Sequence, residues 1–100
     1  MATYKLRPQA RDDLRDIRRW IARDSPVRAR TFIIELTEHF MKIAELSLRH
    51  RVVTDLGPDV RIAVHGNYNI YYRFIGDSAE DVLIIRVLHG GRSLDDIIFG

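Results

Sequence analysis

The chain of 100 residues carries 16 basic and 14 acidic side chains, a formal net charge of +2, and no cysteine. This length corresponds to one domain, so we expect a single domain over residues 1–100 with one hydrophobic core. The lack of cysteine excludes disulfides, thiolate metal sites and a cysteine nucleophile. The longest apolar run, Val82–Ile85, is far below the roughly 20 residues of a membrane-spanning helix. Because residues 1–5 also lack the apolar stretch of a signal peptide, we expect a cytoplasmic protein with no membrane contact.

Arginine accounts for 14 of the 16 basic residues. Its guanidinium makes paired hydrogen bonds with phosphate or carboxylate groups, so the bias favours a phosphate-rich or acidic partner, although a GC-rich genome would produce the same bias. Residues 1–30 hold nine basic and four acidic side chains, a net charge of +5, which predicts a basic face. Asp12, Asp13 and Asp16 interleave with these arginines. We therefore expect this face to meet solvent or an acidic partner segment rather than to bind nucleic acid directly.

The hydrophobic pattern predicts one strand and two helices in the first half of the chain. Thr3–Arg7 alternates between apolar and polar residues, as a short half-buried strand does. Over residues 9–23 apolar side chains recur every three or four positions, which predicts an amphipathic helix. Ser25 and Pro26 are typical of an N-cap and a first helical position, so a second helix should follow over residues 25–46.

The second half of the chain changes to a period of two. Residues 47–59 lack periodicity and end in a Leu-Gly-Pro-Asp turn signal, which predicts a loop. Three antiparallel strands are expected after it, over residues 60–64, 68–75 and 82–88. Residues 89–99 are compatible with either a helical turn or an extended tail.

The expected fold class is α+β, with the order β-α-α-β-β-β. A two-helix hairpin would pack on one face of a four-stranded antiparallel sheet. The first strand would join the edge of the three-stranded meander. Strand 82–88 would be central, because it is apolar on both faces apart from Arg86.

Arg86 needs a partner, because an ionised arginine is almost never buried alone. It would face the sheet rim, a ligand, or a carboxylate such as Asp55 or Glu80. Pairing of the last two strands could also bring Arg86 toward Arg73, and with His89 as the acid this set could cleave RNA. His89 could instead hydrogen-bond the backbone at the strand end. Both the structural and the nuclease interpretation stay open at this level.

Metal and cofactor motifs are missing from the sequence. His39, His50 and His65 share no metal-ligand spacing, and Gly90-Gly91 lacks the remaining glycines and the lysine of a phosphate-binding loop. We expect no metal site and no cofactor.

Several apolar residues lie off the main stripes of the two helices. Val27, Ile34 and Met41 follow one another at a strict seven-residue spacing, and Trp20 flanks the stripe of the first helix. These residues form either a second apolar seam that receives another chain or part of a broad core stripe.

Three segments together resemble the ParE toxins of the RelE/ParE superfamily, also described as plasmid stabilisation toxins. They are residues 4–17, Tyr68–Arg73 and Val82–Arg92, the last reading Val-Leu-Ile-Ile-Arg-Val-Leu-His-Gly-Gly-Arg. In order and spacing they cover nearly the whole chain. The resemblance implies a helix hairpin on an antiparallel sheet and the toxin of a type II toxin–antitoxin pair. It also implies a hetero-oligomer with a ParD-like antitoxin, whose C-terminal segment wraps the toxin.

The resemblance leaves two targets to compare. ParE toxins poison DNA gyrase and block replication, whereas related RelE toxins cut messenger RNA on the ribosome. RelE-type sites combine basic side chains on the sheet with a Tyr or His near the C-terminus, and Arg73, Arg86 and His89 could occupy similar places. However, no Tyr follows Tyr72 and no Lys follows Lys42. We therefore expect gyrase inhibition without a catalytic residue, with mRNA cleavage as the alternative.

The resemblance also suggests which residues make the contacts. The expected gyrase contacts lie in the C-terminal segment: Arg92, Ile97, Ile98 and Phe99. The expected antitoxin contacts line an apolar groove on the helices: Trp20, Ile34 and Met41. One departure is clear, because the family's usual His-Gly-Arg-Arg-Asp reads His-Gly-Gly-Arg-Ser over residues 89–93.

Overall fold

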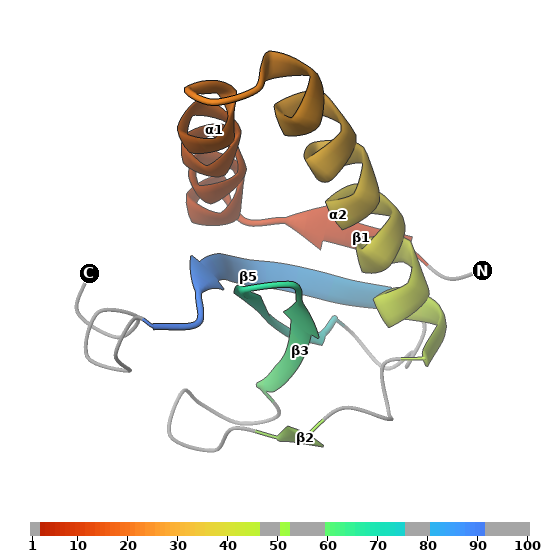
Figure 1. Cartoon of the computed structure of the whole chain (residues 1–100). Helices are drawn as coiled ribbons and strands as arrows, with labels where there is room; N and C mark the ends of the chain where they lie inside the picture. Colours follow the sequence, from red (N-terminus) through yellow and green to blue (C-terminus); the bar gives the residue numbers. More distant parts are fainter. Residues whose placement is uncertain (1–2, 47–50, 53–59, 76–80, 92–100) are drawn as a thin grey trace.

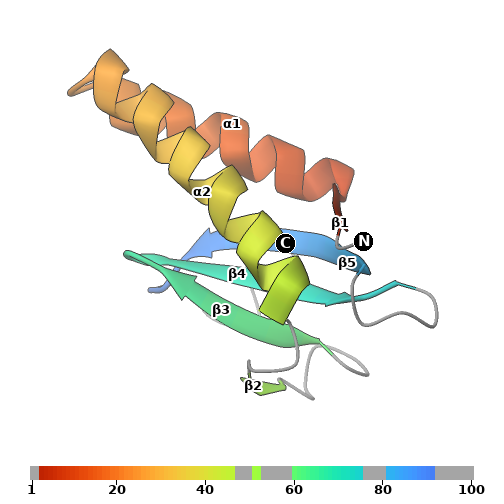
Figure 2. The same ribbon diagram turned by 90° about the vertical axis from the view of Figure 1, so that its right-hand side faces the viewer.

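The computed structural model describes residues 3–46, 51–52, 60–75 and 81–91 of the chain. Its two helices lie on one face of a five-stranded sheet (Figures 1 and 2). In chain order the elements are β1 (Thr3–Leu6), α1 (Pro8–Ala22), α2 (Pro26–Leu46), β2 (Arg51–Val52), β3 (Arg61–His65), β4 (Tyr68–Phe74) and β5 (Asp81–His89). The predicted α+β class and element order are confirmed, with the short strand β2 added.

Local signals set the ends of both helices. Pro8 occupies the first turn of α1, where its missing N–H costs no hydrogen bond. The Ser25 hydroxyl accepts a hydrogen bond from the backbone N–H of Arg28 at 3.1 Å, which is the predicted N-cap of α2. The turn between the helices folds them into a hairpin that lies on the sheet (Figure 2), and the buried apolar side chains of both helices belong to the core. Within the described residues, no helix combines the length and apolar character needed to cross a bilayer.

The strands lie in the order β1-β5-β4-β3-β2. Strands β3, β4 and β5 form the predicted antiparallel meander, and β5 has a partner on each side, as its apolar sequence predicts. Strand β1 is different, because it pairs with β5 in parallel from Thr3↔Asp81 to Leu6↔Ile84. The sheet is therefore mixed rather than fully antiparallel. No hairpin turn joins β1 to β5, and the long connection between them permits the parallel direction, so local sequence does not fix it.

Strand β2 corrects the expected number of strands. It lies within residues 47–59, which were expected to form a loop, and it pairs with β3 through Arg51↔Ile62 and Val52↔Arg61. A strand of two residues has no alternating pattern, so periodicity does not detect it.

The β4–β5 pair contains a register shift near the middle of the sheet. Tyr71 lies opposite Arg86, but the next residue, Tyr72, lies opposite Ile84. Ile85 is therefore an extra residue on β5, as in a β-bulge. Such a bulge bends its strand and re-aims the neighbouring side chains, and here it lies directly beside Arg86.

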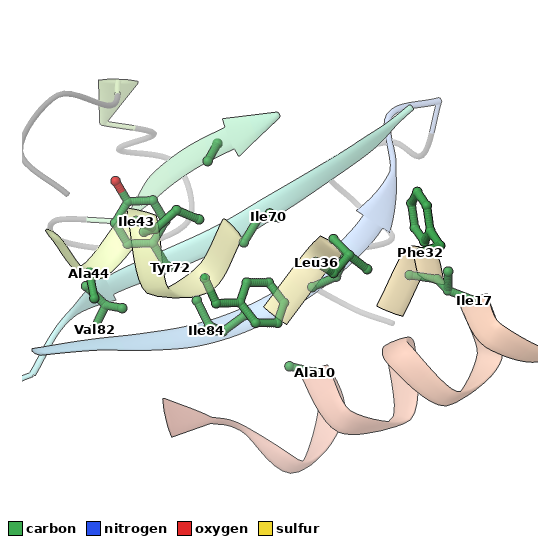
Figure 3. Close-up of a cluster of buried hydrophobic side chains, with 13 residues drawn as sticks. Ala10, Ile17, Phe32, Leu36, Ile43, Ala44, Ile70, Tyr72, Val82 and Ile84 are labelled. Atoms are coloured by element: carbon green, nitrogen blue, oxygen red, sulfur yellow. The ribbon is translucent and has the colours of Figure 1, made fainter. Parts of the chain in front are cut away.

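The core fills the space between the helix hairpin and the sheet (Figure 3). Both helices and strands β3, β4 and β5 contribute to it. Its largest fully buried side chains are Tyr72, Phe40, Leu36, Ile43, Ile70, Ile84, Val82 and Val87. Burial raises the pKa of the Tyr72 phenol to about 12, although the nearby Arg61 charge lowers it. Tyr72 is thus a neutral packing residue at physiological pH.

Replacing Leu36 with alanine tests the placement of α2. Leu36 is fully buried, so Leu36→Ala should lower the free energy of unfolding by about 2–5 kcal/mol through lost burial and the cavity left behind. Ile34 is 55% exposed on the same helix, so Ile34→Ala should change it by less than about 1 kcal/mol. Urea unfolding measures both variants. Equal losses would contradict the helix orientation described here.

Candidate functional site

A buried ion pair joins α1 to β5. The Arg86 Nε donates to Asp13 Oδ2 at 2.8 Å, and its Nη2 donates to Asp13 Oδ1 at 3.0 Å. The two side chains are only 12% and 9% exposed. This two-point geometry is the strong form of a guanidinium–carboxylate contact, because each carboxylate oxygen accepts from a different guanidinium nitrogen. The hydrogen bonds from Arg86 to the carboxylate raise the pKa of Arg86, while burial acts in the opposite direction.

The same carboxylate also accepts a backbone hydrogen bond. The N–H of Val87 donates to Asp13 Oδ2 at 2.9 Å. The pairing of β1 with β5 ends at Leu6↔Ile84, and α1 begins two residues after Leu6. Beyond Ile84, the Asp13 carboxylate accepts a backbone hydrogen bond from the edge of β5 that a neighbouring strand would otherwise accept. A buried backbone donor left without an acceptor would be costly.

Of the three kinds of partner considered for Arg86, the structure shows a carboxylate. A carboxylate does satisfy it, but the residue is Asp13, whereas Asp55 and Glu80 lie outside the described residues. One sequence signal could have identified Asp13. It lies three residues after Ala10 and four before Ile17, both buried, so a helical period places its carboxylate on the apolar face of α1.

The three nuclease candidates are not brought together. Arg73 is exposed and lies opposite Leu83, whereas His89 lies opposite Tyr68. Tyr68 and Arg73 are five positions apart on β4, which corresponds to about 17 Å along an extended strand. Arg86 lies between these positions and is held by Asp13.

His89 makes the contacts of a residue at a strand end. Its Nδ1 accepts a hydrogen bond from the backbone N–H of Gly91 at 3.2 Å, and its ring meets that of Tyr68 edge to face at 5.6 Å between centroids. The backbone contact agrees with the structural interpretation of this residue. Nδ1 acts as an acceptor here, which places the ring proton on Nε2 when the imidazole is neutral.

A cavity of about 290 Å³ opens between α1 and the end of β5. Asp16 and Trp20 line it from α1, Tyr68 from β4 and His89 from β5. Trp20 is 64% exposed, and the Arg23 guanidinium lies over its ring at 5.3 Å from the centroid. The cavity is thus aromatic and acidic, with its largest ring open to solvent.

The three expected antitoxin contacts do not share one cavity. Ile34 and Met41 are exposed along α2 together with Val27, at the seven-residue spacing that places them on one helix face. Trp20 lies on α1 and lines the cavity beside β5. The structure therefore gives two exposed apolar surfaces rather than a single groove. The expected gyrase contacts Arg92, Ile97, Ile98 and Phe99 lie outside the described residues.

Two histidines far apart in sequence meet between α2 and β3. The Nδ1 atoms of His39 and His65 are 2.8 Å apart, a hydrogen-bond distance, beside a cavity of about 360 Å³ that Glu35, Glu38 and Lys42 also line. Sequence spacing did not reveal this contact. Among the described residues, no group of three or more His, Cys, Asp or Glu side chains is arranged to hold a metal ion.

A sequence model of one family covers almost the whole chain. The family is described as the ParE toxin of the type II toxin–antitoxin system parDE, and the match runs over residues 4–94. The chain belongs to the ParE toxin family. No curated protein sequence matches this ParE-family chain significantly.

Solved structures share the fold at low sequence identity. A chain of the chromosomal ParDE toxin–antitoxin system from P. aeruginosa has a TM-score of 0.71 and 17% identity, covering 89% of this chain and 96% of that one. A chain of the toxin–antitoxin complex RelBE2 from Mycobacterium tuberculosis has a TM-score of 0.65 and 24% identity, covering 88% and 96%. At these identities the likeness establishes the ParE/RelE fold, and it does not choose between targets.

Asp13→Asn should lower the free energy of unfolding of this ParE-family chain by about 3–5 kcal/mol, because it leaves Arg86 buried without a counter-charge. The double variant Asp13→Leu/Arg86→Met should recover a large part of the loss, since it removes both charges. Denaturant unfolding of the wild type, Asp13→Leu, Arg86→Met and the double variant measures the coupling between the two side chains.

The neighbouring residue provides a matched control. Asp12 pairs with Arg15 at 3.0 Å, but both side chains are more than half exposed. Asp12→Asn should therefore change stability by less than about 1 kcal/mol. If Asp12→Asn and Asp13→Asn lower the free energy of unfolding by equally small amounts, the buried pair does not hold α1 to β5.

Proposed function

We propose that this protein is a toxin that inhibits DNA gyrase and thereby DNA replication, and that a ParD-like antitoxin neutralises it. Membership of the ParE toxin family is the starting point. A toxin acting on gyrase works in the cytoplasm, which is where we place this protein. The toxin–antitoxin pair would then help to maintain the plasmid or chromosomal region that carries it.

The positions of Arg73, Arg86 and His89 favour gyrase over messenger RNA as the proposed target. Cleavage of RNA by acid–base catalysis needs its groups within hydrogen-bond reach of one reacting phosphate. Arg86 is bound to Asp13 by two hydrogen bonds. Arg73 lies opposite Leu83 and His89 lies opposite Tyr68, so these two residues lie at distant positions along the β4–β5 pair. Contact of Arg86 with a phosphate would break the buried ion pair, and the positions of Arg73 and His89 on the sheet do not place them beside one common phosphate. This supports inhibition by binding rather than by catalysis.

The proposed gyrase contacts are Arg92, Ile97, Ile98 and Phe99. They follow β5, whose last residue His89 is exposed and is anchored by Tyr68. One cation and three large apolar side chains could bind a partly apolar surface on gyrase, with the arginine making the polar contact.

The antitoxin is proposed to cover the exposed apolar residues of the helix hairpin, so that toxin and antitoxin form a hetero-oligomer. Trp20, Ile34 and Met41 are 64%, 55% and 39% exposed. Large apolar side chains gathered on a surface mark protein interfaces, with Trp as the strongest anchor type. Because these residues occupy two surfaces, an antitoxin segment would have to contact both helices to cover all of them.

Gyrase supercoiling assays test the proposed target. The purified protein should inhibit supercoiling and accumulate cleaved DNA–gyrase complexes, and the triple substitution Ile97→Asp, Ile98→Asp, Phe99→Asp should reduce this at least about tenfold through loss of apolar contacts. His89→Ala should still inhibit. Codon-positioned cuts in ribosome-bound mRNA that vanish in His89→Ala, with supercoiling untouched, would replace this function by the nuclease alternative.

Substitution of the exposed helix residues tests the proposed antitoxin surface. Ile34→Asp and Trp20→Ala should each weaken antitoxin binding about tenfold or more, because apolar anchors are lost, and should leave gyrase inhibition unchanged. Titration calorimetry with the antitoxin encoded beside the toxin measures the first effect. Gln9→Asp, which adds the same charge at an exposed residue at the start of α1, far along that helix from Trp20, is the control. If Gln9→Asp weakens binding as much as Ile34→Asp, the surface is assigned wrongly.

A further inference from the structure

The contact between two histidines ties α2 to the end of β3. The Nδ1 atoms of His39 and His65 are 2.8 Å apart, although 26 positions separate the residues in the sequence. Their ring centroids are 5.0 Å apart. The two Nδ1 atoms therefore point toward each other, because rings that met side by side at this N–N distance would have closer centroids. Both side chains are half-buried.

The number of protons on this pair decides whether the contact is favourable. A ring nitrogen without a proton accepts a hydrogen bond, whereas both nitrogens of a charged imidazole are donors. With both rings neutral, one Nδ1 donates to the other. With one ring charged, the same hydrogen bond becomes stronger. With both rings charged, two N–H donors and two positive charges face each other, so the contact must open.

The charged side chains around the pair do not offset a second positive charge. Glu35, Glu38 and Lys42 of α2 line the adjacent cavity. Glu35 is bound by Arg28 at 2.6 Å, and hydrogen bonding from this guanidinium lowers the pKa of the Glu35 carboxyl. Among these described side chains, two carboxylates are therefore matched by two cations.

A row of aromatic contacts leads from the pair across the sheet. The ring of His65 meets that of Phe32 at 5.3 Å between centroids, and Phe32 meets Tyr68 of β4 at 5.6 Å. Tyr68 in turn contacts His89 at the end of β5. Burial raises the pKa of the Tyr68 phenol, so this ring stays neutral and adds no charge beside the pair.

The turn between β3 and β4 is the element that the pair holds against α2. It consists of Gly66, which has a positive φ of 58°, and Asn67, and it directly follows His65. The Asn67 carbonyl accepts a hydrogen bond from the Gly90 N–H at 2.8 Å. The turn is thus attached to α2 through the histidine pair and to the residues after β5 through this hydrogen bond.

We propose that the His39–His65 pair is a pH switch, which holds the β3–β4 turn against α2 while it carries at most one proton and releases the turn when both rings are protonated. Histidines of an unfolded chain titrate near about pH 6.5. Below this pH the unfolded chain binds two protons where the closed pair binds one, so stability falls as the pH falls. The switch does not depend on the proposed target.

The ring geometry favours a proton over a metal ion between the histidines. A zinc ion would lie about 2.0–2.1 Å from each nitrogen, at a point beside the N–N line on which both lone pairs converge. Here the two Nδ1 atoms instead point toward each other. Within the described residues, no third His, Cys, Asp or Glu completes a metal site with them.

Urea unfolding at about pH 6.5 and about pH 5 tests the switch. Acidification should raise the unfolding equilibrium constant of the wild type at least about fivefold more than that of His39→Asn or His65→Asn. Asparagine places a non-titrating amide near the position of Nδ1, and its carbonyl can accept from the remaining charged ring. The comparison uses the change with pH, so a constant loss of stability in either variant does not affect it.

The remaining described histidine provides the control. His89 is exposed and lies outside the pair, so His89→Asn should keep the pH dependence of the wild type. In wild-type ¹⁵N spectra the rings of His39 and His65 should take up their protons in two separate steps. The hydrogen-exchange protection of the Gly90 N–H should fall at least about fivefold on acidification, and it should not fall in His39→Asn.

Three results would overturn the proposal. They are an equal effect of pH on the wild type and on both asparagine variants of the pair, uptake of both protons in one step with Gly90 still protected, and a melting temperature that Zn²⁺ or Ni²⁺ raises only when both histidines are present. The last result would assign the pair to a metal ion. Supercoiling assays at about pH 7.5, where the pair is closed, judge the gyrase proposal separately.

Discussion

The contact of Asp13 with Arg86 and the Val87 N–H fixes how the helix hairpin lies on the sheet. One carboxylate accepts two guanidinium hydrogen bonds and one backbone hydrogen bond at the place where β5 loses its strand neighbour β1. Burying two charges is expensive, and the pair is favourable only because its hydrogen bonds are so fully satisfied. The position of α1 over β5, and hence of the cavity beside His89, depends on this arrangement.

The same contact shapes the chemistry available on the sheet. It withdraws the most central basic side chain, Arg86, from any ligand, while the other candidates Arg73 and His89 remain far apart on β4 and β5. The solved ParDE and RelBE2 chains share this fold with similar TM-scores. A common backbone can therefore carry different surfaces, and the target must follow from particular side chains. In this chain the exposed functional candidates lie on the helices rather than at the centre of the sheet.

Much of the fold could be predicted because its signals are local. The N-cap at Ser25, the proline at the start of α1 and the periods of the helices and meander strands each act within a few residues. For Ile34 and Met41 the sequence left an exposed seam and a broad core stripe both open, and the structure shows both residues exposed. What could not be predicted involves distant pairs: the parallel direction of β1, the bulge at Ile85, and the separation of Trp20 from Ile34 and Met41.

The sequence by itself determined a small, cysteine-free, mildly basic domain of two helices and a meander, and its motifs placed it in the ParE family. Composition, period and turn chemistry are sufficient for this, because each is a property of neighbouring residues. Only the tertiary structure decided the role of the many arginines. It buried Arg86 against Asp13, paired Arg28 with Glu35, and left Arg18, Arg19 and Arg30 around one cavity. The charge of an arginine is set by its residue type, but whether that charge is neutralised depends on which carboxylate the fold brings within hydrogen-bond distance.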